Sequence, residues 1–399
     1  MAALSILFLR RRHMPRVLMS ANQGWNILNF RAGLVRALIA DGHEVIAAAG
    51  DDGTFPKLRQ LGVRPIALPI DGAGTSIVRD AWLFLRYWEL MRRERPDIFL
   101  GWTIKPNIYG SLAAALCGIP CINNISGLGT AFLRPGWLTA VARSLYRPGL
   151  RRSATIFFQN EADRALFIER GIVRPEQAQR IPGSGIDTTW FDPSTYPEPP
   201  GNPVRFLMVA RLIRDKGVLE YVEAARRLRH HHRDVRFELL GSLDIPNRTA
   251  IGREMLQQWI DEGIIDYLGT MDDVRPALAR ADCVVLPSYR EGLPRVLIEA
   301  AAMARPAIAT DVPGCRDVII EGATGFLCRP RDTIDLADRM EAMLRLSSAG
   351  RKAMGDAGRI HIEASFHEKI VTEMYRQEID RVILRSDRKR QRVRLPINI

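Results

Sequence analysis

The sequence lacks the features of a disulfide-bonded or membrane-spanning protein. Its five cysteines are an odd number without a Cys-x-x-Cys pair, which favours reduced thiols in a cytosolic compartment. No uninterrupted apolar run approaches the roughly 18 to 20 residues that a membrane-spanning helix requires. With 47% apolar and 26% charged residues, the chain has the composition of a globular protein, and its 399 residues suggest two or three domains.

Motifs for a bound metal are also missing. No Asp-x-Asp pair lies where it could serve a diphosphate, since residues 51–52 and 272–273 are adjacent acids at predicted helix starts, where they are expected to act as caps. Three histidines at residues 230–232 end a predicted helix beside arginines, an arrangement more typical of exposed histidines than of metal ligands. We therefore expect neither a metal nor another cofactor.

The net charge of +12 is concentrated in a few segments. Arginines cluster at residues 10–12, at residues 134–152 and from Arg385 onward, and Trp137 and Tyr146 lie among those of the internal segment. Aromatic and basic residues together are typical of an anionic membrane surface. Nucleic acid is not expected, because no zinc-finger, RNA-recognition or basic-zipper pattern accompanies the charge. A solvated charged surface stays the alternative.

Apolar strand-like runs alternate with amphipathic helix-like runs along the whole chain. A loop is expected at residues 21–26, after the first strand. Such alternation is typical of doubly wound parallel sheets, so the sequence predicts an α/β protein of two Rossmann-like domains facing a central cleft. The strands are expected at residues 17–20, 45–48, 65–68, 97–100, 121–124 and 155–158, and then at 204–209, 235–240, 264–268, 283–286, 307–309 and 325–328.

Changes in composition set the expected domain boundaries. Residues 1–13 place an apolar run before three arginines, the reverse of a secretory signal, and are interpreted as a non-structural leader that precedes a translation start at Met14. A proline-rich linker is expected at 192–203. The remaining boundaries give an N-terminal domain at 14–187, a C-terminal domain at 188–365, a helix at 366–385 packing back on the N-terminal domain, and a basic tail at 386–399.

Two glutamates bracket the turn between strand 283–286 and the next helix. Glu291 lies in the turn, and Glu299 lies within a helix expected to begin near Leu293 or Pro294. Two carboxylates with free helix N–H groups between them suit a ligand with hydroxyls at both ends and an anion in the middle, such as a nucleotide-sugar. Taken alone, this spacing is explained more simply if one glutamate is an ordinary loop residue and the other an ordinary surface residue of a helix, with no ligand between them.

Two cations follow the strand that ends at Val209. Arg211 and Lys216 are expected at the carboxyl end of that strand, where they could neutralise a diphosphate. A departing diphosphate gains negative charge in the transition state, and fixed cations lower that barrier. Alone, these cations would be solvated; together with Glu291 and Glu299 they indicate a donor site.

The pattern Arg211-x4-Lys216 followed by Glu291-Gly-Leu-Pro-x4-Glu299-Ala resembles the retaining glycosyltransferases of the GT-B fold, family 4, over nearly the whole chain. The resemblance implies that Arg211 and Lys216 bind the donor diphosphate, that Glu291 lies beside the donor hexose, and that Glu299 binds the ribose. It makes the C-terminal domain the nucleotide-sugar domain and the N-terminal domain the acceptor domain. Further donor contacts are assigned to Gly292, Leu293, Gly24 and Ser126.

Two runs in the first domain, at residues 103–110 and 122–132, resemble bacterial enzymes that add N-acetylgalactosamine or a related sugar to undecaprenyl-diphosphate-linked sugars. Lys105 and Asn26 are assigned to the acceptor, with helix capping as the alternative for Lys105. Ser126 stands where many family members carry a histidine; its hydroxyl can hydrogen-bond to a sugar but cannot act as a base.

The aromatic residues at 82–88 are expected mainly to pack in the core, and the alternative places some of them, with neighbouring arginines, against lipid or the acceptor diphosphate. The expected function is retaining, metal-independent transfer of a UDP-activated hexose, N-acetylated as in N-acetylgalactosamine, to a polyprenyl-diphosphate-linked sugar. The resemblance places the enzyme peripherally on the cytoplasmic face of the membrane. The alternatives are a UDP-sugar 2-epimerase of the same architecture and a non-catalytic nucleotide-binding adaptor.

Overall fold

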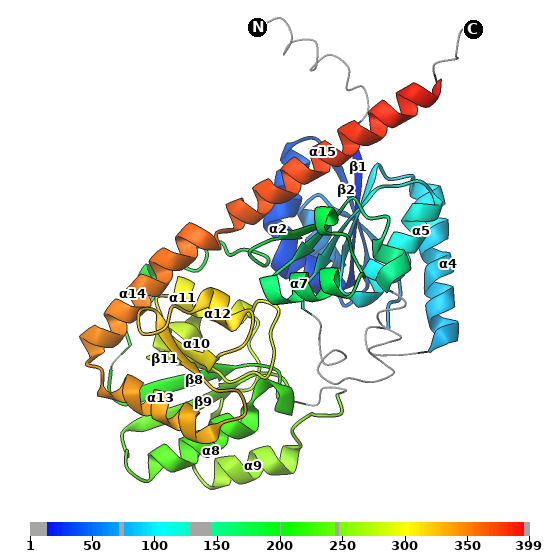
Figure 1. Cartoon of the computed structure of the whole chain (residues 1–399). Helices are drawn as coiled ribbons and strands as arrows, with labels where there is room; N and C mark the ends of the chain where they lie inside the picture. The colour runs from blue at the N-terminus through cyan, green and yellow to red at the C-terminus, as the bar shows by residue number, and fades with distance from the viewer. Residues whose placement is uncertain (1–13, 72–75, 128–145, 200, 244–246, 395–399) are drawn as a thin grey trace, which may run out of the picture. The chain divides into compact units, whose positions relative to one another are not determined.

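The computed structural model describes residues 14–71, 76–127, 146–199, 201–243 and 247–394, without the side chains of 387–394 (Figure 1). The chain divides into two compact units, Met1–Ser184 with Glu368–Ile399, and Gly185–His367. The expected leader at 1–13 lies outside the described residues, as do Trp137 and most of the basic segment at 134–152.

The first unit contains a seven-stranded parallel sheet in the order β3-β2-β1-β4-β5-β6-β7. Its strands are β1 (Arg16–Gln23), β2 (Glu44–Gly50), β3 (Arg64–Ala67), β4 (Ile98–Trp102), β5 (Cys121–Ile125), β6 (Thr155–Phe158) and β7 (Ala178–Arg180). Its helices are α2 (Gly24–Ala40), α3 (Phe55–Gln60), α4 (Ile77–Glu94), η1 (Pro106–Gly110), α5 (Ser111–Leu116), α7 (Glu161–Glu169), η3 (Pro175–Gln177) and α15 (Glu368–Arg394).

The second unit contains a six-stranded parallel sheet in the order β10-β9-β8-β11-β12-β13. Its strands are β8 (Val204–Val209), β9 (Val235–Leu240), β10 (Asp266–Tyr267), β11 (Cys283–Leu286), β12 (Ala307–Thr310) and β13 (Gly325–Cys328). Its helices are η4 (Pro193–Thr195), η5 (Arg214–Lys216), α8 (Val218–Arg229), α9 (Arg253–Asp261), α10 (Arg275–Arg280), α11 (Arg295–Ala302), α12 (Cys315–Val318), α13 (Thr333–Arg345) and α14 (Ser348–Ser365).

Helices cover both faces of each sheet, which is why the strands read as continuous apolar runs. In the first unit, Val17 and Met19 of β1 pack in one core with residues of α2 and α15, whereas Leu18 packs with residues of α4 and α5. In the second unit, α8 and α13 supply one core and α10, α11 and α14 supply the other. The predicted fold class of two doubly wound α/β domains is confirmed.

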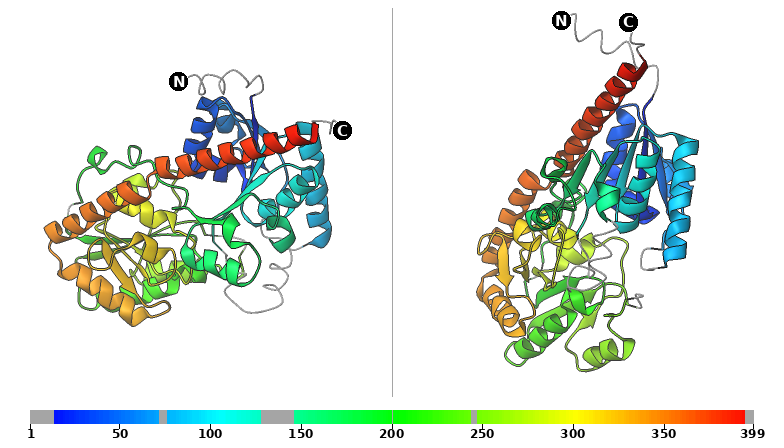
Figure 2. Two further views of the ribbon diagram at one scale, coloured as in Figure 1. Left: turned by 45° about the horizontal axis from the view of Figure 1, so that its top comes forward. Right: turned by 45° about the vertical axis from the view of Figure 1, so that its right-hand side comes forward.

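Helix α15 lies along α2 of the first unit (Figure 2). Its Tyr375 is buried, and its phenol oxygen accepts hydrogen bonds from Trp102 Nε1 and Asn124 Nδ2, both at 3.0 Å. The helix runs from Glu368 to Arg394, so much of the residue range expected to form a basic tail is helical.

Three local expectations are wrong. The loop expected at 21–26 does not form, because β1 continues to Gln23 and α2 starts at Gly24, where the Asp52 carboxylate accepts the N–H of Trp25 at 2.8 Å. The stretch expected as a linker, 192–203, lies inside the second unit. Tyr146, interpreted as a residue for a membrane surface, is only 3% exposed and packs edge-on against Phe167.

Candidate functional site

The carboxyl ends of β8 and β11 form the centre of the candidate donor site. These two strands are neighbours, with Cys283 paired to Phe206, and the chain order of the sheet reverses between them. In open α/β sheets, ligands bind beyond the carboxyl ends of the strands at such a switch point. The turn η5 follows β8 and carries Lys216, and the loop after β11 carries Glu291.

Lys216 and Glu291, 75 positions apart in the chain, form an ion pair through Lys216 Nζ and Glu291 Oε1. Their side chains are 22% and 11% exposed. Such shielding from water strengthens the attraction relative to a surface pair. The structure thus brings together two of the predicted catalytic residues, and each neutralises the other.

A backbone approach at Gly217 holds the two loops together. Gly217 has φ +76°, and a Cβ built on it would lie 2.1 Å from the carbonyl oxygen of Pro287, just after β11. The N–H of Tyr289 donates to the Asp215 carbonyl at 3.0 Å. Only a residue without a side chain tolerates this combination of left-handed backbone and close contact, so Gly217 sets the position of Lys216 next to it.

The remaining residues predicted to contact the donor are Arg211 and those of the loop before α11. Arg211 is exposed, and its guanidinium makes no ion pair with any described residue. Gly292 is buried and Leu293 half-buried. Helix α11 starts at Arg295 with Pro294 as its extended N-cap, slightly later than expected, because Pro294 has ψ 112° and so does not enter the helix.

Glu299 lies on α11 and is held by a residue that the sequence analysis did not select. Arg295 Nε donates to Glu299 Oε1 at 2.9 Å, and Arg295 Nη1 donates to the Gly185 carbonyl at 2.7 Å. Burial raises the pKa of Glu299, while the charge and hydrogen bond of Arg295 oppose that rise. Arg295 is therefore a positioning residue that orients the Glu299 carboxylate and opposes the effect of burial on its pKa. The i,i+4 spacing of the two residues on one helix was the signal that could have identified it.

Replacing Arg295 by methionine is expected to weaken UDP binding at neutral pH by about tenfold and to make it more dependent on pH. Without the guanidinium, burial raises the pKa of Glu299 further, so the carboxylate that would accept the ribose hydroxyls is lost as the pH falls. Titration calorimetry with UDP between pH 5.5 and 8.5 measures this. Arg295→Lys, which keeps the charge, is the control. Identical pH profiles for Arg295→Met and the unchanged chain would contradict the assignment.

The predicted acceptor residue Lys105 is largely buried in the first unit. Its Nζ lies 2.6 Å from Asp80 Oδ1, and Tyr109 donates its hydroxyl to Asp80 Oδ2 at 2.9 Å. Asp80 lies in the first turn of α4. Burial and the neighbouring Asp80 raise the pKa of Tyr109, so the phenol stays a hydrogen-bond donor. Asp80 lies on another helix, 25 positions away in the chain, so the sequence alone could not have predicted it as the partner of Lys105.

The other selected residues of the first unit follow β1 and β5. Gly24 is buried, and a Cβ on it would lie 2.5 Å from Thr54 Oγ1, so packing against that turn accounts for a glycine here. Asn26 lies on α2 and is half-buried. Ser126, exposed after β5, donates its hydroxyl to Asn124 Oδ1 at 3.0 Å. Their assignment to a donor or acceptor stays a prediction.

Thr103, at the end of β4, adopts a strained backbone that the sequence did not reveal. This β-branched residue has φ +66°, and its hydroxyl donates to Asn22 Oδ1 at 2.8 Å. A π-helical turn, Pro106–Gly110, follows. Both features are costly and concentrate at functional sites, which supports a role for this end of the sheet.

One residue from each group considered for metal binding has a protein partner. Asp52 accepts the Trp25 N–H at 2.8 Å, and Asp273 pairs with Arg275 at 2.7 Å. His232 Nε2 lies 2.6 Å from Glu341 Oε2. Within the described residues, no group of three or more His, Cys, Asp or Glu side chains could hold a metal ion.

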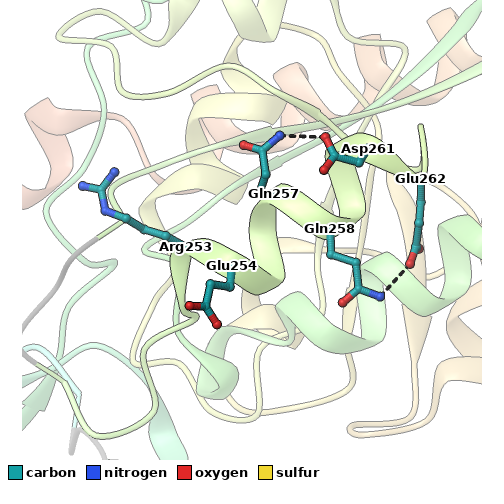
Figure 3. Close-up of a pocket in the computed structure, with 6 residues that line it drawn as sticks. All are labelled: Arg253, Glu254, Gln257, Gln258, Asp261 and Glu262. Carbon is teal, nitrogen blue, oxygen red and sulfur yellow. Dashed lines mark hydrogen bonds between the residues drawn. The ribbon is translucent and has the colours of Figure 1, made fainter.

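A shallow depression lies on α9, away in sequence from the predicted site residues (Figure 3). It is lined by polar and charged side chains of that helix and of Glu262, its C-cap. Gln257 pairs with Asp261 and Gln258 with Glu262, both at 2.8 Å. These i,i+4 contacts are typical of a solvated helix face. The depression contains none of the predicted site residues.

None of the helices in the described part of the chain is long and apolar enough to cross a bilayer.

Two family models match the chain. The model described as "Glycosyl transferase 4-like domain" matches residues 29–184, and the model described as "Glycosyl transferases group 1" matches residues 203–346. The second match covers Lys216, Glu291 and Glu299, whereas the first covers Lys105 and Ser126.

Relatives and a solved structure extend the likeness to nearly the whole chain. The chain is 27% identical over 386 residues to the N,N'-diacetylbacillosaminyl-diphospho-undecaprenol alpha-1,3-N-acetylgalactosaminyltransferase of Campylobacter jejuni, which covers 91% of this chain and 98% of the relative. It is 24% identical over 281 residues to the UDP-Gal:alpha-D-GlcNAc-diphosphoundecaprenol alpha-1,3-galactosyltransferase of Escherichia coli, over 68% and 72% of the two chains. The structure of Anabaena Alr3699/HepE in complex with UDP and glucose matches with a TM-score of 0.74 at 17% identity, over 92% and 100% of the two chains.

Proposed function

Because this chain belongs to the glycosyltransferases described by the group 1 and 4-like family models and has the GT-B fold, we propose that it transfers a hexose from a UDP-sugar to a sugar linked to polyprenyl diphosphate. The observation that carries the proposal is the Lys216–Glu291 pair at the carboxyl ends of β8 and β11. Arg211 nearby in sequence and Glu299 on α11 supply the other charges that a nucleoside diphosphate requires.

The donor roles follow from the chemistry of these side chains. Arg211 and Lys216 would stabilise the charge that develops on the diphosphate as its bond to the sugar breaks. Glu291 would lie against the hexose hydroxyls once the diphosphate draws Lys216 away. Glu299, oriented by Arg295, would accept hydrogen bonds from the ribose hydroxyls, and Gly292 and Leu293 would offer backbone N–H groups.

We propose retention of the anomeric configuration. The bond from the sugar's anomeric carbon to the diphosphate oxygen breaks, and an acceptor hydroxyl oxygen bonds to that carbon from the same face. The acceptor proton passes to the departing diphosphate, so UDP leaves and no protein nucleophile is needed. Ser126 can contact the sugar or acceptor through its hydroxyl, whose bond to Asn124 is exchangeable.

The acceptor class rests on the relatives and on the first unit. The Campylobacter and Escherichia relatives are named for undecaprenyl-diphosphate-linked acceptors, and the Campylobacter relative supports N-acetylgalactosamine as the sugar transferred. Lys105 and Asn26 are proposed for the acceptor; Lys105 would have to exchange Asp80 for the acceptor diphosphate. Because such an acceptor is anchored in a bilayer, we propose that the enzyme acts in bacterial glycan assembly, peripherally on the cytoplasmic face of an anionic membrane.

Turnover is expected to be unchanged by EDTA, within about twofold. Arg211 and Lys216 supply the positive charge that a divalent cation would otherwise bring to the diphosphate. The measurement is UDP release with acceptor present, before and after EDTA treatment and after addition of Mg²⁺. Loss of turnover in EDTA with recovery in Mg²⁺ would show that Arg211 and Lys216 do not stabilise the departing diphosphate without a metal ion.

The function is tested by incubating the chain with a panel of UDP- and GDP-sugars, with and without a membrane lipid extract, and following nucleotide release. We expect release from one UDP-sugar only when lipid is present. A UDP-sugar 2-epimerase would convert its substrate without an acceptor, and a nucleotide-binding adaptor would release nothing under either condition. Each of those results would overturn the proposal.

A further inference from the structure

Tyr289 connects the two loops that carry the candidate catalytic pair, Lys216 and Glu291. It follows β11 and stands two positions before Glu291. Its N–H donates to the carbonyl of Asp215 at 3.0 Å, directly before Lys216, and its hydroxyl donates to Glu220 Oε1 at 2.6 Å, four positions after Lys216. One residue of the Glu291 loop therefore binds the chain on both sides of Lys216.

The hydroxyl of Tyr289 holds the Glu220 carboxylate. Glu220 lies in the first turn of α8, where the free N–H groups of the helix favour a negative charge. Its other oxygen, Oε2, is buried and accepts no hydrogen bond from the described part of the chain. Burial raises the pKa of Tyr289, and the Glu220 carboxylate raises it further, so the phenol stays protonated and donates. Removal of this hydroxyl would leave the carboxylate without a donor among the described residues, which costs more than the loss of one bond between solvated groups.

The ring of Tyr289 and the residue before it have partners on two further elements. The guanidinium of Arg331, between β13 and α13, lies 4.5 Å from the centre of the Tyr289 ring in a cation–π contact. Arg331 has φ +60°, a strained backbone that persists only where the surrounding structure holds it. Thr310 Oγ1, at the end of β12, donates to the Ser288 carbonyl. None of these contacts involves the candidate catalytic pair, so the position of Tyr289 does not depend on that ion pair.

The independent support of Tyr289 matters when the donor binds. On the proposed function, the Lys216 ammonium leaves Glu291 for the donor diphosphate, so the ion pair no longer joins the two loops. The contacts of Tyr289 remain, together with the close approach at Gly217. The backbone of the Lys216 loop then stays in place, and only the flexible four-carbon side chain moves. A cation that is already in place stabilises the developing charge without reorganisation of the site, and its displacement slows the reaction.

We propose that Tyr289 is a positioning residue for this reaction: by binding the chain before and after Lys216, it holds the ammonium group where the charge on the departing diphosphate develops. This inference rests on the proposed function for the identity of the anion. The connection between the loops stands on the contacts of Tyr289 and Ser288 with β12, η5, α8 and the segment before α13.

The test is Tyr289→Phe, which keeps the ring and removes the hydroxyl. We expect kcat for UDP release with acceptor present to fall about tenfold, and KM for UDP-sugar to change less than about twofold, because the misplaced cation acts in the transition state. Glu220→Ala, which removes the acceptor of the hydrogen bond, should reproduce this loss. Glu220→Gln, which keeps an acceptor oxygen, should retain at least about a third of kcat. The double variant of Tyr289→Phe and Glu220→Ala should lose no more than either substitution alone.

Tyr221→Phe is the matched control. Tyr221, in α8 of the same unit, is fully buried in the hydrophobic core, and its hydroxyl lies 2.8 and 3.1 Å from the backbone carbonyl oxygens of Phe206 and Glu238. Loss of this hydroxyl should lower the urea midpoint of unfolding and leave kcat unchanged. Equal falls in kcat for the Tyr289 and Tyr221 variants would overturn the proposal, because a general loss of stability would explain both. A rise in KM with kcat unchanged in Tyr289→Phe would also overturn it, since Tyr289 would then contact the donor directly.

Amide hydrogen exchange separates this proposal from the proposed function. We expect exchange over residues 214–217 to be about tenfold faster in Tyr289→Phe than in the unchanged chain. Transfer by the unchanged chain, with exchange and kcat unaltered in Tyr289→Phe, would overturn the positioning role and leave the function standing. Faster exchange in Tyr289→Phe, with no transfer from any UDP-sugar by the unchanged chain, would overturn the function and leave the connection between the loops standing.

Discussion

Replacing Lys216 by alanine is expected to lower kcat about 10²- to 10³-fold. The substitution removes a cation proposed to stabilise the departing diphosphate, and it leaves the Glu291 carboxylate, 11% exposed, without its partner beside an incoming anion. Donor binding should weaken as well, since that carboxylate repels the diphosphate. Steady-state UDP release with acceptor present measures kcat and KM separately.

The reciprocal substitution, Glu291→Ala, is expected to abolish detectable turnover while UDP affinity is retained, because Lys216 is freed from its ion pair. Lys352→Ala and Glu254→Ala are the controls, since each removes an exposed charge of the second unit that lies outside the proposed site. Both controls should leave kcat unchanged. A Glu291→Ala enzyme as active as the unchanged chain would remove Glu291 from the site.

Replacing Gly217 by alanine is expected to destabilise the second unit by about 2 to 5 kcal/mol. The left-handed backbone costs a residue with a Cβ about 1 to 2 kcal/mol, and the contact of that Cβ with the Pro287 carbonyl adds about 1 to 3 kcal/mol of overpacking. Turnover should fall too, because relief of the contact moves the loop that carries Lys216. Urea unfolding followed by tryptophan fluorescence measures the stability.

Gly263→Ala is a matched control for the backbone contribution. Gly263 has φ +68°, close to the +76° of Gly217, but a Cβ built on it meets nothing within 4 Å. It should cost only about 1 to 2 kcal/mol and leave turnover unchanged. Equal destabilisation by the two substitutions would show that the Pro287 contact does not hold the η5 loop.

The strands of both sheets could be predicted from sequence because they are buried on two faces. Runs such as Val204–Val209 and Cys283–Leu286 are almost wholly apolar. This is expected because helices cover both faces of a parallel sheet and so exclude most polar side chains from its strands. The start of α2 could not be predicted, since an acid from another loop, Asp52, caps it. Trp82, expected mainly in the core, is 61% exposed. Tyr146 and Trp82 were misjudged for a similar reason: only tertiary packing decides which aromatic residue of a basic or amphipathic stretch turns inward.

The candidate donor residues could be selected from their spacing, since Lys216 and Glu291 follow neighbouring strands whose carboxyl ends meet at one edge of the sheet. Their ion pair, and the support that Arg295 gives to Glu299, required the structure. The acceptor residues were harder to select. Lys105 is bound by Asp80 from α4, a contact that depends on the tertiary structure. The strain at Thr103 comes from its positive φ, which cannot be predicted from the residue type.

We propose that a single sugar is transferred to the acceptor at the Lys216–Glu291 site. Mass spectrometry and NMR of a short-prenyl diphosphate-linked acceptor, after incubation with UDP-sugar, measure this transfer. We expect an acceptor extended by one hexose unit in the donor's anomeric configuration, one UDP released per unit added, and no product from Lys216→Ala. Consumption of UDP-sugar with an unextended acceptor, or full product from Lys216→Ala, would contradict it.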